Sequence, residues 1–128
     1  MKLLLDTHIV LWALSDDPRL TPEHRKALEG EARLMVSAVS IWEISIKRTL
    51  GKLEAPANIA DVIQSAGCQP LAITWAHADR AGRLPAHHND PFDRLLIAQS
   101  QCEDIPVITE DKAFSAYDLA LYEGQGTS

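Results

Sequence analysis

Several features that define common protein classes are scarce or absent in this sequence of 128 residues. Its two cysteines, Cys68 and Cys102, are far apart and form no Cys-x-x-Cys pair, so no disulfide framework is expected. The longest apolar run, Ile9 to Leu14, has six residues, whereas a membrane-spanning helix needs about 20. Asp6 interrupts the apolar start before it reaches the length of a secretory signal. We therefore expect a cytoplasmic protein with reduced thiols and no membrane association.

Positive charge is also in short supply. The chain has 12 Lys and Arg residues against 18 Asp and Glu residues, which gives a formal net charge of −6. Proteins that bind nucleic acids by neutralising many phosphates are usually basic, so this class is disfavoured. Glycine-rich phosphate loops and the Gly-x-Ser-x-Gly turn of serine hydrolases are absent. An enzyme whose carboxylates hold metal ions is compatible with the acidic balance, because bound cations offset part of the charge.

What the sequence does contain is typical of one folded domain. Apolar residues make up 46% of the chain and are spread along it, so we expect a single domain over residues 1–122 and a polar tail over 123–128. Strands are expected at 2–5, 33–36, 70–73, 105–108 and 119–122, and helices at 9–14, 22–30, 39–50, 58–66, 75–83, 91–102 and 112–117. This alternation predicts an α/β fold with a central, mainly parallel sheet of four or five strands.

Acidic residues follow the strands of this predicted sheet. Asp6 comes directly after the first strand, and Glu43 lies two turns into the helix after the second. Asp90 and Asp93 open the helix before the next strand, and Asp111 follows that strand. Parallel sheets bind ligands at the carboxyl ends of their strands, so these acids are the candidate site.

Each acid also has a purely structural explanation. Asp6, Asp90 and Asp111 stand where helix N-caps are expected, and Asp93 fits the third position of a capping box. Glu43 has Lys47 four residues later, which is the favourable order for a surface ion pair. Capping does not explain why every strong junction carries an acid, because serine and threonine cap as well. On a helical wheel, Val39, Trp42 and Ile46 form an apolar stripe, and Glu43 lies only about 40° from Val39.

Convergence of four acids would have a large energetic consequence. Carboxylates about 5 Å apart repel by roughly 3 kcal/mol per pair at an effective dielectric near 20, and whole domains are stable by only about 5–15 kcal/mol. Such a cluster must bind protons or cations. Oxygen ligands favour Mg²⁺ or Mn²⁺ over zinc. His87 and His88 are adjacent and have no metal-ligand spacing, so we interpret both as loop residues that do not bind metal.

Four segments in this order resemble the sequence blocks of PIN-domain ribonucleases, and most closely those of VapC-type toxins from bacterial toxin–antitoxin pairs. The segments are Leu4-Leu5-Asp6-Thr7-His8, Val36-Ser37-Ala38-Val39-Ser40-Ile41-Trp42-Glu43-Ile44, His88-Asn89-Asp90-Pro91-Phe92-Asp93-Arg94-Leu95-Leu96-Ile97-Ala98 and Ile108-Thr109-Glu110-Asp111-Lys112-Ala113-Phe114. The resemblance covers nearly the whole chain and implies a PIN-like three-layer α/β/α sandwich.

The resemblance implies that Asp6, Glu43, Asp93 and Asp111 are the catalytic acids that bind Mg²⁺ or Mn²⁺, with Asp90 as a further metal ligand or a helix cap. The adjacent Glu110 is the alternative to Asp111 as the fourth acid. It also implies an RNA substrate, with transfer RNA as the family-based expectation, a homodimer, and a VapB-type antitoxin that blocks the site. His8 departs from the family, which commonly has asparagine or serine there. Basic residues that could guide RNA to the site are Lys47, Arg48, Lys52, Arg80, Arg83 and Arg94.

Two other classes place an acid after an apolar strand. An aspartyl-phosphate phosphatase requires a second aspartate two residues after the first, where this chain has His8. A receiver-like signalling domain requires a lysine after its last strands. Lys112 suits that role poorly, because it directly follows Asp111. Both classes therefore fit the sequence less well than a metal-dependent nuclease.

Overall fold

The computed structural model describes residues 1–122, and the expected tail over 123–128 lies outside them. A four-stranded sheet forms its centre, with β1 (Lys2–Leu5), β2 (Arg33–Ser37), β3 (Gln69–Leu71) and β4 (Val107–Ile108). The strand order is β3-β2-β1-β4, and every neighbouring pair is parallel. The predicted mainly parallel sheet is therefore confirmed, with four strands.

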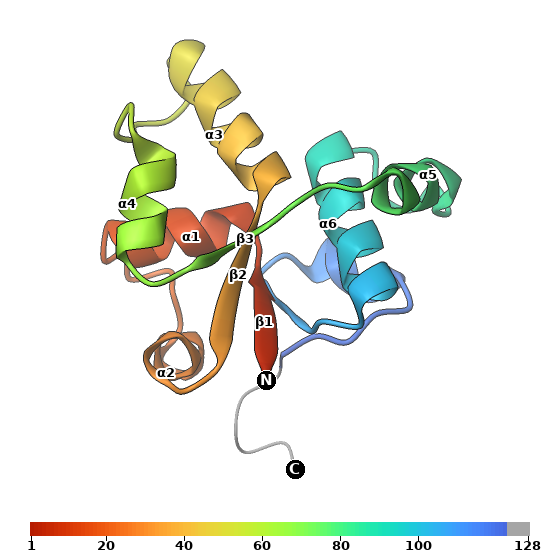
Figure 1. Ribbon diagram of the computed structural model, residues 1–128, viewed down its shortest axis with the longest axis horizontal. Coiled ribbons are helices and arrows are strands. Elements are labelled where there is room, and N and C mark those ends of the chain that lie inside the picture. The colour runs from red at the N-terminus through yellow and green to blue at the C-terminus, as the bar shows by residue number, and fades with distance from the viewer. Residues whose placement is uncertain (123–128) are drawn as a thin grey trace.

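Helices cover both faces of the sheet, as Figure 1 shows. Their bounds are α1 (Thr7–Leu14), α2 (Pro22–Glu29), α3 (Ala38–Thr49), α4 (Ile59–Ser65), α5 (Trp75–Arg83) and α6 (Pro91–Glu103), followed by a 3-10 helix η1 (Lys112–Ala116). Threonines cap two of these helices: the Thr21 hydroxyl accepts a hydrogen bond from the His24 amide, and the Thr74 hydroxyl accepts one from the His77 amide, both at 3.2 Å. These caps fix where α2 and α5 begin.

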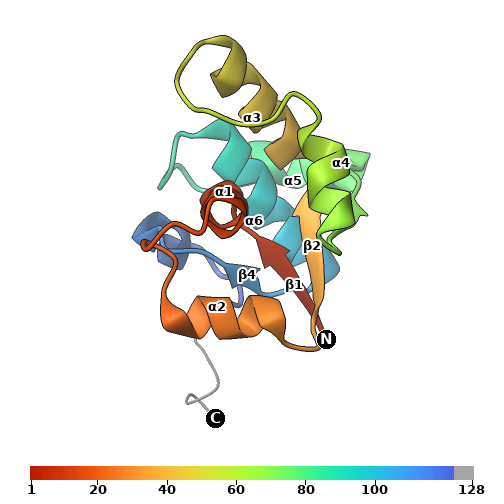
Figure 2. The same cartoon turned by 90° about the vertical axis from the view of Figure 1, so that its left-hand side faces the viewer.

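The two faces of the sheet build two hydrophobic clusters. Leu3 and Leu5 point to the cluster that includes α1, α2 and α4, whereas Leu4 points to the cluster under α6 and η1. Figure 2 shows α1 and α2 in front of β1 and β4. Burial on both faces explains why the strands are continuously apolar and do not alternate with polar residues. This arrangement is the three-layer α/β/α sandwich that the resemblance implied.

The prediction of a strand over 119–122 is wrong. Only Leu121 forms a bridge, to Val107, and Tyr122 donates its amide to the Val107 carbonyl at 2.9 Å. The partner strand β4 has just two residues, and the preceding Pro106 has no amide hydrogen to extend the ladder. Pro70 is compatible with β3 because that strand lies at the edge of the sheet.

The predicted apolar stripe of α3 is wrong for Trp42, which is 60% exposed. The buried face instead contains Val39, Ser40, Glu43 and Ile44. These residues span about 140° of the helix, and Trp42 lies about 130° from the middle of that arc. Glu43 is therefore on the buried face, as expected from its position beside Val39.

None of the helices within residues 1–122 combines the length and the apolar character that a bilayer span requires. The expectation of one domain over 1–122 with a polar tail stays a prediction.

We predict that Phe114→Ala lowers the free energy of unfolding by about 3–5 kcal/mol, because the ring is fully buried under α6 and its removal leaves a cavity. Leu50→Ala is the control, since Leu50 is 61% exposed and should change stability by less than about 0.5 kcal/mol. Urea denaturation measures both values, and equal effects would contradict the described core.

Candidate metal centre

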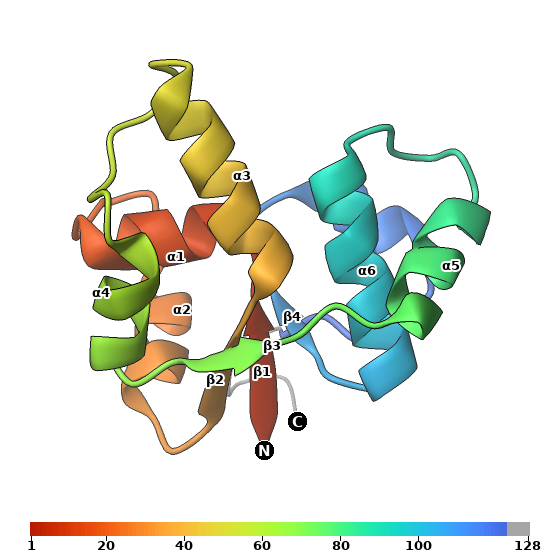
Figure 3. The same ribbon diagram turned by 45° about the horizontal axis from the view of Figure 1, so that its top comes forward.

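The predicted acids meet at the carboxyl end of β1, between α3 and α6, which Figure 3 shows on either side of that strand end. Asp6 follows β1, Glu43 lies on α3, Asp93 lies on the first turn of α6, and Asp111 precedes η1. The parallel sheet produces this convergence, because the carboxyl ends of its strands point the same way.

Asp6 is buried and only partly hydrogen-bonded. Its Oδ2 accepts a hydrogen bond from the Thr109 hydroxyl at 2.7 Å. Its Oδ1 is buried and has no partner among the described residues, and the side chain does not cap α1. Burial raises the pKa of this carboxyl, and Glu43 adds to the shift, against the lowering effect of the Thr109 hydrogen bond. Helix capping therefore does not explain Asp6.

Glu43 is 2% exposed, so the expected Lys47 pair is not a surface pair. Lys47 Nζ donates to Glu43 Oε2 at 2.6 Å, while Oε1 is buried without a described partner. Partial burial opposes the positive charge of Lys47, but the hydrogen bond to Glu43 and the nearby aspartates outweigh it and raise the pKa of the lysine. Lys47 thus stays charged and balances one of the four acids.

The pKa of Asp93 is raised to about 7, first by burial and then by the charges of Asp6, Asp90 and Glu43, although its hydrogen bond with His88 opposes the shift. The predicted convergence of acids therefore has the expected electrostatic effect: one carboxyl of the cluster holds its proton close to neutral pH.

Asp90 and Asp111 both act as helix caps. Asp90 Oδ1 accepts hydrogen bonds from the amides of Phe92 and Asp93 at 2.8 and 3.1 Å. Asp111 Oδ1 accepts one from the Ala113 amide at 2.9 Å, which leaves Oδ2 directed toward His88. Asp111 therefore caps η1 with one carboxylate oxygen and faces the acidic cluster with the other.

Glu110 and Thr109 complete the segment after β4. The carboxylate of Glu110 contacts His24 Nδ1 at 2.7 Å, on α2. The Thr109 hydroxyl donates to Asp6 and accepts from the Asp111 amide at 3.0 Å, so it links two of the acids. Sequence reasoning missed Thr109, although its place between the last strand and Asp111 was a usable signal.

Both adjacent histidines lie on a loop, as expected, and it is the loop between α5 and α6. The Nε2 of His88 is 2.7 Å from Asp93 Oδ2. The ring of His87 instead packs edge-on against Tyr117, with centroids 5.3 Å apart. The donor set of the cluster therefore includes a nitrogen atom as well as carboxylate oxygens.

Arg94 is not available to guide RNA. Its guanidinium donates four hydrogen bonds to backbone carbonyls of the segment that ends at His88, at 2.8–3.2 Å, and the acceptors are Ala81, Leu84, Pro85 and His88. This side chain stabilises the loop between α5 and α6. Arg80 and Arg83 also have partners, Gln101 at 2.6 Å and Asp79 at 3.0 Å.

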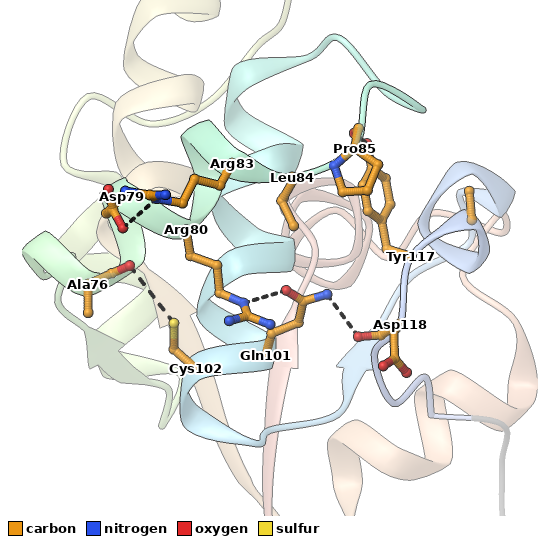
Figure 4. A pocket seen from close by; sticks show the side chains of 11 residues that line it. Ala76, Asp79, Arg80, Arg83, Leu84, Pro85, Gln101, Cys102, Tyr117 and Asp118 are labelled. Atoms are coloured by element: carbon orange, nitrogen blue, oxygen red, sulfur yellow. Dashed lines mark hydrogen bonds and ion pairs between the residues drawn. The ribbon is translucent and has the colours of Figure 1, made fainter.

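A separate pocket of about 690 Å³ lies between α5, α6 and the segment after η1 (Figure 4). Arg80, Gln101 and the Asp118 carbonyl form a chain of hydrogen bonds along its wall. None of the four acids lines this pocket. Its Arg80, Arg83 and Gln101 side chains already have hydrogen-bond partners within the pocket wall.

The acidic cluster fits a divalent cation. Asp6 Oδ1 and Glu43 Oε1 are buried oxygens without described partners, which is costly unless a ligand binds them. The raised pKa values of Asp6 and Asp93 report the repulsion and desolvation that a cation would relieve. His88, Asp93 and Asp111 also place one donor atom each within 4.8 Å of one another.

We predict that the metal-free protein loses stability as pH rises from about 4 to about 7, the interval between the ordinary pKa of Asp93 and its raised value. The native state keeps the Asp93 proton up to about pH 7, whereas the unfolded chain releases it near its ordinary pKa of 3.8. The native state then binds more protons across this interval, so the free energy of unfolding falls with rising pH. With EDTA present, the melting temperature of Asp93→Asn should fall less steeply with rising pH than that of the wild type. Equal slopes in the two proteins would contradict the raised pKa of Asp93.

Comparisons with known proteins agree with this fold. A ribonuclease of Mycobacterium tuberculosis (strain ATCC 25618 / H37Rv), VapC22, is 25% identical over 117 residues, which are 89% of this chain and 90% of that protein. The structure of VapBC2 from Rickettsia felis, bound to a DNA fragment from its promoter, matches with a TM-score of 0.70 at 15% identity, covering 98% of this chain and 100% of that one. A toxin–antitoxin complex from Klebsiella pneumoniae matches at 0.68 and 17% identity, covering 94% and 97%.

The two structural matches are below 25% identity and show the shared fold. The family model for the PIN domain matches residues 3–119, which include all four acids of the cluster. The chain therefore belongs to the PIN domain family.

Proposed function

We propose that this protein is a metal-dependent endoribonuclease and acts as the toxin of a VapC-type pair. The observation that carries the proposal is the cluster of Asp6, Glu43 and Asp93. Asp6 and Glu43 each have a buried oxygen without a described partner, and the pKa values of Asp6 and Asp93 are raised, as expected of a site that fits a divalent cation. Membership of the PIN domain family and the similarity to a ribonuclease support RNA cleavage as the reaction. Mg²⁺ is the proposed ion, and Mn²⁺ can take its place.

Asp6, Glu43, Asp93 and Asp111 would hold the ion in this proposal. A divalent ion bound here would activate a water molecule and stabilise the charge that develops on a phosphodiester. The chain's own residues prepare the site: Thr109 orients Asp6 through its 2.7 Å hydrogen bond, and Lys47 offsets the charge of Glu43. Asp90 fixes the start of α6 and thereby the position of Asp93.

An aromatic pair beside the acids suits single-stranded RNA. Trp42 precedes Glu43 and Phe92 precedes Asp93, and their rings meet edge-on with centroids 5.4 Å apart. The pair brings the exposed Trp42 ring next to α6, where a nucleobase can stack on it.

The biological setting follows from the same comparisons. Toxin–antitoxin complexes are among the similar structures, which supports a VapB-type antitoxin as the partner of this chain. A homodimer, transfer RNA as the substrate and a cytoplasmic location are part of the proposal on family grounds. The phosphatase and receiver-like alternatives are not favoured, because the matches are to PIN domains and toxins.

We predict that Asp6→Asn and Asp93→Asn each lower kcat/KM for RNA cleavage by at least about 100-fold. A metal ion supplies several kcal/mol of transition-state stabilisation, and about 1.4 kcal/mol corresponds to a factor of ten. Asp61→Asn, an exposed acid on α4, is the matched control. A fluorescent oligonucleotide assay with Mg²⁺ measures the rates, and full activity of Asp6→Asn would overturn the proposed function.

We also predict that Trp42→Ala weakens RNA binding by about 5- to 150-fold, because stacking of one base on an aromatic ring contributes about 1–3 kcal/mol. Trp75→Ala is the control, since Trp75 is exposed but lies on α5. Fluorescence anisotropy with a Ca²⁺-loaded enzyme measures affinity. Equal losses in both variants would argue against a specific role for Trp42.

A further inference from the structure

His88 has the spacing of a metal ligand. Its Nε2 is 2.7 Å from Asp93 Oδ2 and 4.0 Å from Asp111 Oδ2. Two donor atoms that bind one ion at right angles, with bonds of about 2.1 Å, lie roughly 3 Å apart. The imidazole nitrogen and the two carboxylates are therefore close enough to share an ion, with a nitrogen where a purely oxygen-based site was expected.

The backbone on both sides of His88 is held in place. The His88 amide donates to the Tyr117 hydroxyl at 2.9 Å, and that hydroxyl donates to the Pro85 carbonyl at 2.8 Å. The Arg94 guanidinium donates to the carbonyls of Pro85 and His88. Figure 4 shows Pro85, which belongs to this loop, beside Tyr117. A donor held in this way loses little conformational entropy when it binds an ion.

The contacts of the two adjacent histidines differ. His87 packs on the Tyr117 ring and is not part of the group formed by His88, Asp93 and Asp111. On this loop, His87 therefore packs against an aromatic ring, whereas His88 faces the acids. This difference provides a control variant one residue away from the proposed ligand.

We propose that His88 is a nitrogen ligand of the ion held by Asp93 and Asp111, and that it makes the centre bind Mn²⁺ more tightly than Mg²⁺. Imidazole is a suitable ligand for transition metals, whereas Mg²⁺ binds almost exclusively through oxygen and keeps several waters. This inference rests on the proposed metal centre and adds a specific preference among divalent ions.

The test is a spectroscopic measurement of Mn²⁺ ligation. Electron spin echo spectra of the Mn²⁺-loaded protein, labelled with ¹⁵N-histidine, should show coupling to a ¹⁵N nucleus in the wild type and in His87→Gln, and none in His88→Gln. Titration of the free Mn²⁺ signal should show His88→Gln binding Mn²⁺ at least about tenfold more weakly, since even indirect metal contacts are worth 10- to 100-fold. The affinity for Mg²⁺, measured by competition, should change much less.

Circular dichroism and thermal unfolding of both variants establish that they fold. Wild-type protein that binds Mn²⁺ without ¹⁵N coupling would overturn the inference, as would equal losses of Mn²⁺ and Mg²⁺ affinity in His88→Gln. RNA cleavage by the same wild-type sample separates the two hypotheses. Cleavage without nitrogen coupling refutes only the His88 ligand, whereas coupling without cleavage refutes only the proposed nuclease.

Discussion

Electrostatic repulsion among buried carboxylates is the constraint on which the rest of this structure depends. The parallel sheet brings the ends of β1, β2 and β4 together, and the acids after them share one small region. Burial raises the pKa of Asp6 and of Asp93, so the free protein holds these groups at an energetic cost. Surrounding groups reduce that cost only in part: Lys47 neutralises Glu43, and Thr109 hydrogen-bonds Asp6. A divalent cation would remove the remainder.

The convergence of the acids could be predicted from the sequence because it follows from chain topology. Strands of four or five apolar residues alternating with helices specify a parallel sheet, and in such a sheet the residue after each strand lies at one edge. Asp6 directly follows β1 and needed nothing more than this rule. Asp111 comes three residues after β4, and the rule alone does not distinguish it from Glu110, which contacts His24. To predict the positions of Glu43 and Asp93, one must also know where the helix that carries each residue begins. The Ser37 and Asp90 caps determine those starts.

Other features depend on tertiary contacts between distant residues and could not be predicted. His88 reaches Asp93 because Arg94 and Tyr117 hold its loop, and Tyr117 is 29 residues away from it. The exposure of Trp42 depends on which side of α3 faces the sheet, which a stripe of three apolar residues does not determine. The missing fifth strand reflects the two-residue length of β4. In each case, the determining interaction joins segments whose pairing has no local signal.

The most direct test of the central claim is a calorimetric titration of metal-free protein with Mn²⁺, comparing the wild type with Glu43→Gln. The substitution keeps the size of the buried side chain and removes its charge, so the account predicts a variant that binds Mn²⁺ much more weakly. A Glu43→Gln variant that binds Mn²⁺ as tightly as the wild type would contradict the claim that these carboxylates are held together for a cation.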